Sequence, residues 1–62
     1  MDREQIMQVI RNLAKSQGFY SRLLQSIKEL QLGQPEKVDE FFTKLEAQNF
    51  KDELDVMLYF EQ

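Results

Sequence analysis

The first half of the chain carries an apolar heptad repeat that runs without interruption. Counting Ile6 as position a, seven of the eight a and d positions are apolar and the eighth is a serine: Ile6, Val9, Leu13, Ser16, Tyr20, Leu23, Ile27 and Leu30. A repeat of 3.5 residues is typical of a helix that packs one narrow face against another helix. The sequence therefore predicts a continuous N-terminal helix over residues 3–32, with Asp2 as its N-cap and a length of about 45 Å.

Gly18 is the one position at which the continuity of this helix is in question. A glycine inside a helix costs about 1 kcal/mol relative to alanine, and Gly18 followed by Phe19 is also typical of a helix that ends on a left-handed glycine. The heptad nevertheless keeps its phase through Gly18, which falls at the outward-facing f position. We therefore favour a continuous helix, and a break at Gly18 that gives a compact three- or four-helix bundle remains the alternative.

Two shorter helices are expected in the second half of the chain. Gly33 suits the left-handed position that ends the first helix, and Pro35 suits the first turn of the next one, so a turn is predicted at 32–35. The apolar residues that follow predict a helix over about 35–47, and Asn49 is expected to cap a last helix over about 50–61. The predicted fold is all-α: one helical domain over 1–62, with a long N-terminal helix packed antiparallel against two shorter helices.

The composition argues against a catalytic or metal-binding protein. The 62 residues include no histidine, no cysteine and only two glycines, so the usual general base, nucleophile and phosphate-binding loop are missing. The acids Asp52, Glu53 and Asp55 lack the glycine of an EF-hand loop and alternate with apolar residues, which predicts an exposed first helical turn. We expect no enzyme activity, no cofactor, no metal and no small-molecule substrate.

The composition also limits the cellular compartment in which the protein is expected. No apolar run is long enough to cross a membrane, and a chain without cysteines suits a reducing compartment. The expected location is therefore the cytoplasm, with no membrane partner.

Charge is divided unevenly between the two halves of the chain. Residues 1–32 hold five cations and three anions, whereas residues 33–62 hold three cations and eight anions, so the halves carry +2 and −5. One interpretation is that a basic half folds against an acidic half. The other is that a charged face binds a partner of opposite charge.

Two groups of residues are candidates for partner binding. On a continuous helix, the spacing of Arg11, Lys15, Gly18 and Arg22 places three cations and a glycine in one basic stripe, which is either a solvated face or a site for an acidic partner. Nucleic acid is a less favoured partner, because the net charge is −3 and the isoelectric point is about 4.8. Four apolar residues are hard to bury behind a single seam and are predicted to form a homodimer or bind a protein: Phe19, Val56, Tyr59 and Phe60.

The segments Leu13–Leu24 and Leu45–Asp52 resemble short helical open reading frames found in mobile elements of Gram-positive gut bacteria. The resemblance implies an accessory protein of a phage or conjugative element, without an assigned biochemical function, and it supplies no site residues. Together these features favour a non-enzymatic helical protein-interaction module or small accessory protein. The alternative is a small nucleic-acid-associated regulator that uses the basic stripe.

Overall fold

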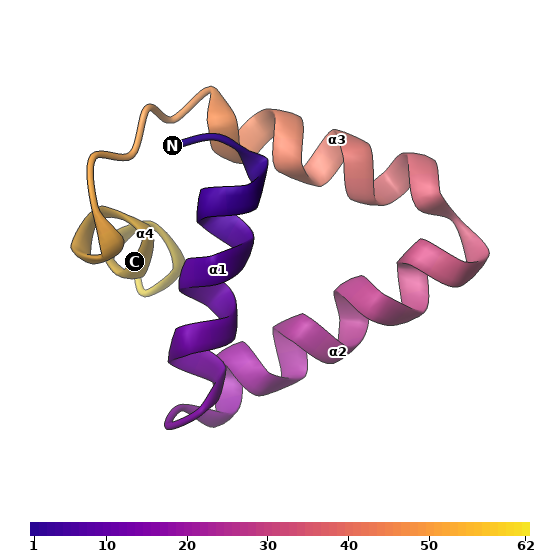
Figure 1. Ribbon diagram of the computed structural model, residues 1–62, viewed down its shortest axis with the longest axis horizontal. Helices are drawn as coiled ribbons and strands as arrows, with labels where there is room; N and C mark the ends of the chain where they lie inside the picture. The colour runs from indigo at the N-terminus through magenta and orange to yellow at the C-terminus, as the bar shows by residue number, and fades with distance from the viewer.

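The computed structural model describes all 62 residues and contains four helices and no strand (Figure 1). The helices are α1 (Arg3–Ala14), α2 (Gly18–Gly33), α3 (Pro35–Glu46) and α4 (Glu53–Phe60). Helix α1 packs against each of the other three, and α2 also packs against α3. The predicted all-α class is confirmed, and none of the four helices is both long and apolar enough to cross a membrane.

The predicted continuous N-terminal helix is wrong, because the chain turns between α1 and α2. The amide of Ser16 donates to the carbonyl of Leu13, and Gln17 is extended with φ −127° and ψ 120°. The longest dimension of the whole molecule is 30 Å, too short for a helix of about 45 Å. Leu13 and Tyr20, on either side of the turn, are both buried in the same core. The heptad keeps its phase because both sides of the turn supply that core.

Both glycines differ from their predicted conformations. Gly18 is the first residue of α2, so it lies neither in the middle of a helix nor in a left-handed helix end. Gly33 is the last residue of α2, and neither glycine has a positive φ. Only Gln34 separates α2 from α3, and Pro35 begins α3 as predicted.

Helix α4 begins later than predicted, and its cap is a different residue. Asn49 adopts a left-handed conformation with φ 56° after the end of α3, which asparagine tolerates better than most residues. Asp52 is the N-cap of α4, and its Oδ1 accepts a hydrogen bond from the amide of Asp55 at 3.2 Å. The predicted antiparallel limb of two short helices is therefore wrong. In Figure 1, α4 lies on one side of α1, while α2 and α3 extend on the other.

Eleven buried side chains, all of them apolar or aromatic, form one core: Ile6, Val9, Ile10, Leu13, Tyr20, Ile27, Val38, Phe42, Leu45, Phe50 and Val56. Helix α1 supplies four of them and lies at the centre of the fold. Its start is fixed by a capping box, as predicted for Asp2: the Asp2 carboxylate accepts from the Gln5 amide, and the Gln5 side chain accepts from the Asp2 amide. Helix α1, which contacts every other helix, thus has an N-terminus that is fixed by two reciprocal hydrogen bonds.

Candidate functional site

A groove of about 740 Å³ lies between α1, α2 and α3. Its floor is apolar: the half-buried Met7 lies beside the edges of the core residues Ile27, Val38 and Phe42, and the exposed Leu32 lies at its edge. The polar residues that line it are Arg3, Glu4, Gln8, Arg11, Lys28 and Gln31. Three cations and one anion therefore surround an apolar floor, a combination suited to an apolar helix that carries acidic side chains.

The groove uses a face of α1 that the core does not use. Arg3, Met7 and Arg11 follow each other at intervals of four residues, so they lie along one side of the helix. The four buried residues of α1 lie on a different side. One twelve-residue helix thus contributes to the core on one side and to the groove on the other.

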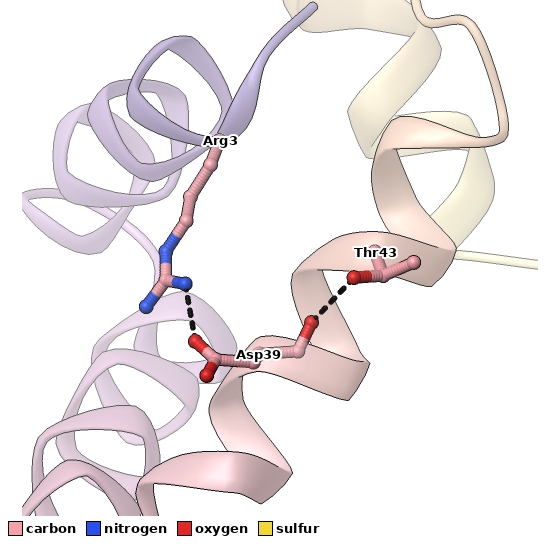
Figure 2. Close-up of polar contacts among 3 residues, drawn as sticks. All are labelled: Arg3, Asp39 and Thr43. Atoms are coloured by element: carbon pink, nitrogen blue, oxygen red, sulfur yellow. Dashed lines mark hydrogen bonds and ion pairs between the residues drawn. The ribbon is translucent and has the colours of Figure 1, made fainter.

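Arg3 is fixed at one end of the groove by two contacts. Figure 2 shows its guanidinium against Asp39 of α3, with 2.6 Å between Nη1 and Oδ1, and the Thr43 hydroxyl donating to the Asp39 carbonyl at 2.8 Å. The Arg3 Cζ atom also lies 4.9 Å from the centroid of the Phe42 ring, which is a cation–π contact. This is the one salt bridge between the basic and acidic halves. It leaves Arg11 and Lys28 as the groove cations without a carboxylate partner.

Leu32, at the edge of the groove, is the most exposed large apolar side chain of the protein. It is 91% exposed, although it lies in the last turn of a helix that supplies core residues. A leucine in this position gains the full benefit of apolar burial only when another surface covers it. The groove therefore has an apolar edge as well as an apolar floor.

A second exposed apolar surface is the outer face of α4, which we define as Leu54, Leu58 and Glu61. The two leucines are 59% and 58% exposed and lie four residues apart, with Glu61 three residues further on the same side. The residues from Asp52 to Gln62 include four acids and no cation. This surface is apolar at its centre and acidic around it, the reverse of the charge at the groove.

The structure separates the residues of the predicted basic stripe. Arg11 lies at the groove, Lys15 is the C-cap of α1, and Gly18 and Arg22 belong to α2. An ideal Cβ on Gly18 would lie 3.2 Å from the Arg22 Nη1 atom, so the Arg22 side chain reaches toward this glycine, which remains exposed. A continuous stripe on one helix is therefore wrong, because it depended on the unbroken helix.

The predicted apolar surface is also only partly exposed. Val56 is fully buried in the core, so its predicted place on the surface is wrong. The half-buried ring of Phe60 has its centroid 6.1 Å from that of Phe19, 6.0 Å from Tyr20 and 6.4 Å from Phe41. Phe19 and Tyr59 remain exposed at the edge of this aromatic cluster. Most of the aromatic side chains thus pack against one another inside one copy.

Sequence reasoning missed the exposed leucines and two of the three groove cations, Arg3 and Lys28. The available signal for Leu54 and Leu58 was that α4 carries apolar residues on more than one side, which indicates that more than one of its faces is covered. Leu32 lies outside the a and d positions of the heptad, which was a weaker signal of its exposure. Lys28 comes to the groove from α2 and Arg11 from α1. Their presence at the same groove follows only from the turn between these helices.

Tyr20 carries the one buried side-chain polar atom that lacks a hydrogen-bond partner, its hydroxyl oxygen. Burial raises the pKa of this hydroxyl above its ordinary value, and the nearby carboxylate of Glu61 raises it further. The ring contacts Phe19 and Phe60 edge-on, and no polar atom forms a hydrogen bond with its hydroxyl. The hydroxyl lies in the aromatic cluster and not in the groove.

Comparisons of the chain with models of protein families, with curated proteins and with solved structures found no match.

Proposed function

We propose that this protein is a non-enzymatic interaction module whose groove binds an acidic, amphipathic helix of a protein partner. The observation that carries the proposal is the combination of an apolar floor, a 91% exposed leucine at the edge and two unpaired cations in one groove. Grooves with apolar floors bind helices through side chains spaced three and four residues apart. Cations around the floor select partners that carry acids beside those apolar residues.

Leu32 supports this proposal on energetic grounds. Burying an exposed leucine side chain is worth about 1.5–3 kcal/mol. In the free protein Leu32 makes little use of that gain. A helix lying along the floor would cover it together with Met7, which is half-buried. Exposing Leu32 to water costs free energy in the unbound protein. A partner helix that covers the groove would remove this cost.

Nucleic acid is the less favoured partner for the same groove. Arg3, Arg11 and Lys28 could contact phosphates, but the floor between them is apolar and Glu4 lies beside them. Phosphate binding requires mainly cationic and polar groups, and the protein as a whole carries −3. We treat nucleic acid binding as an outcome of the test. As part of the proposal, we place the module in the cytoplasm as an accessory protein of a mobile element.

Selection from a displayed library of helical peptides tests this function. We expect the folded protein to enrich peptides with leucine-like residues four positions apart and acids beside them. The variant R11E/K28E should lose these peptides, whereas K15E/K44E should keep them, because it has the same net charge and alters exposed cations outside the groove. Failure to enrich such peptides, or equal retention by both variants, would contradict the proposal.

A parallel binding measurement with random duplex DNA separates the two classes of partner. If the protein binds the duplex with an affinity that falls steeply with salt, and R11E/K28E abolishes that binding, the groove is a nucleic-acid site and the protein-binding proposal is wrong. We expect no binding to the duplex at 0.15 M salt.

A further inference from the structure

We infer that the helix bound in the groove is α4 of a second copy of this chain, so that copies associate head to tail. This inference rests on the proposed function of the groove and names its partner. The first step is a homodimer in which the outer face of α4 from one copy lies on the groove of the other.

The two surfaces are complementary in composition. The groove offers an apolar floor and edge with three cations and one anion around it. The outer face of α4 offers Leu54 and Leu58 at the spacing of one helical turn, and the segment from Asp52 to Gln62 has four acids and no cation. An acidic helix with an exposed apolar strip is the partner that the groove chemistry selects, and this chain contains one.

The fold already shows how α4 packs beside α1. Within one copy, α4 contacts α1 and buries Val56, with Phe60 reaching the aromatic rings of α2 and α3. These contacts use the side of α4 opposite to Leu54 and Leu58. A second α1 can therefore be contacted through the outer face while the first contact stays intact. Association needs neither unfolding nor exchange of α4 between copies.

Because the two surfaces differ, the contact is heterologous, and this has a consequence for stoichiometry. After two copies bind, the pair still has one free groove and one free outer face of α4. Growth therefore continues unless the geometry closes a ring. The average mass should rise steadily with concentration, instead of stopping at twice the mass of one chain.

Two variants test the inference by disabling one surface each. The groove variant is R11E/K28E and the helix variant is L54Q/L58Q; all four side chains are exposed, and circular dichroism establishes that each variant is folded. If either is unfolded, R11Q/K28Q or L54A/L58A replaces it. In sedimentation velocity at several concentrations, we expect the wild type and K15E/K44E to grow in mass and each variant alone to remain a monomer.

Mixing the two variants gives the decisive measurement. The groove variant keeps a working α4 and the helix variant keeps a working groove, so an equimolar mixture should form a 1:1 dimer and nothing larger. Raising the salt concentration should weaken this dimer. A mixture that stays monomeric would overturn the inference, as would a groove variant that still associates, because α4 would then pair with another α4.

A wild type that remains monomeric at hundreds of micromolar would also overturn the inference. That result would leave the proposed function standing if the peptide selection succeeds, because selected peptides bind the groove without any self-association. Conversely, failure of the peptide selection would contradict the proposed function itself. The two failures are thus distinguishable.

Discussion

The two sides of α1 differ in how much apolar surface they carry and in what covers it: four buried apolar residues line the core side, whereas Met7 is the one apolar α1 residue at the groove. On one side, α4 closes the fold with Val56 in the core and Phe60 at the centre of an aromatic cluster. On the other side, the groove floor has no fourth helix, and Arg11 and Lys28 stand beside it. A chain of about 60 residues buries only about 60% of its unfolded surface, so covering one side leaves little chain for the other. The open side is therefore the one on which we propose that an external helix binds.

The largest expected effect is on the covered side. Phe60→Ala removes the ring that joins α4 to α2 and α3, and we expect it to lower the free energy of unfolding by about 2–4 kcal/mol. Leu58→Ala, on the exposed side of the same helix, should change it by less than about 0.5 kcal/mol. Urea denaturation of both variants measures the difference at a concentration where the wild type is monomeric. Equal losses would show that α4 does not close the fold through Phe60.

A smaller effect of opposite sign is expected within the same aromatic cluster. Tyr20→Phe keeps the ring contacts and removes a hydroxyl that is buried without a partner. An unsatisfied buried polar group costs about 1–3 kcal/mol, so the variant should be more stable than the wild type by about 1 kcal/mol. A lower denaturation midpoint would instead show that the hydroxyl has a hydrogen-bond partner in solution.

The same residue gives the stability a dependence on alkaline pH. Burial and Glu61 raise the pKa of Tyr20 above its ordinary value of 10.0, so the unfolded chain loses this proton before the folded protein does. This residue's contribution to stability is therefore complete below about pH 10 and declines as the pH rises through the folded pKa. Thermal melts from pH 8 upward should show a decline in the wild type that is reduced in Tyr20→Phe. If the melting temperatures of the wild type and Tyr20→Phe declined in parallel with pH, a raised pKa of Tyr20 would be contradicted.

The smallest expected effect is on the open side. Asp39→Asn removes the carboxylate that pairs with Arg3, and pairs that reach solvent contribute at most about 1 kcal/mol, so we expect a loss near 0.5 kcal/mol. The change also frees a third cation at the groove. If the groove selects acidic helices, this variant should bind the selected peptides more tightly than the wild type at low salt. Unchanged binding would show that Arg3 serves the fold alone.

The sequence predicted those elements that depend on local signals. Asp2 begins α1 and Pro35 begins α3 as expected, because a side-chain cap and a fixed φ act within one turn. The turn before Gly18 was predicted only as the less favoured alternative, since Leu13 and Tyr20 fit one continuous seam as well as a shared core. The rotation of α4 was missed because Leu54 with Leu58 and Val56 with Phe60 form two apolar sides, and only the aromatic rings of α2 and α3 choose between them.

The groove itself depends on three helices, so a pattern within one segment does not reveal it. Of the residues predicted from the sequence to bind a partner, Arg11 is the one that lines it. Met7 lies one helical turn before it on the same side of α1, but Lys28 and Leu32 are separated from it by the turn. Predicting them requires the angle between α1 and α2, which follows from the packing of the whole core.

Gln34 is both the C-cap of α2 and the N-cap of α3. Its amide donates to the Leu30 carbonyl at 2.7 Å, and its carbonyl accepts from the Lys37 amide at 3.0 Å. One inserted residue here would change the direction and rotation of α3 relative to α2 and carry Val38 and Phe42 away from α1. The connection over residues 47–52 is longer and lies outside both helices that it joins. During evolution of this fold, we expect insertions and deletions to accumulate between α3 and α4 and to be eliminated at Gln34.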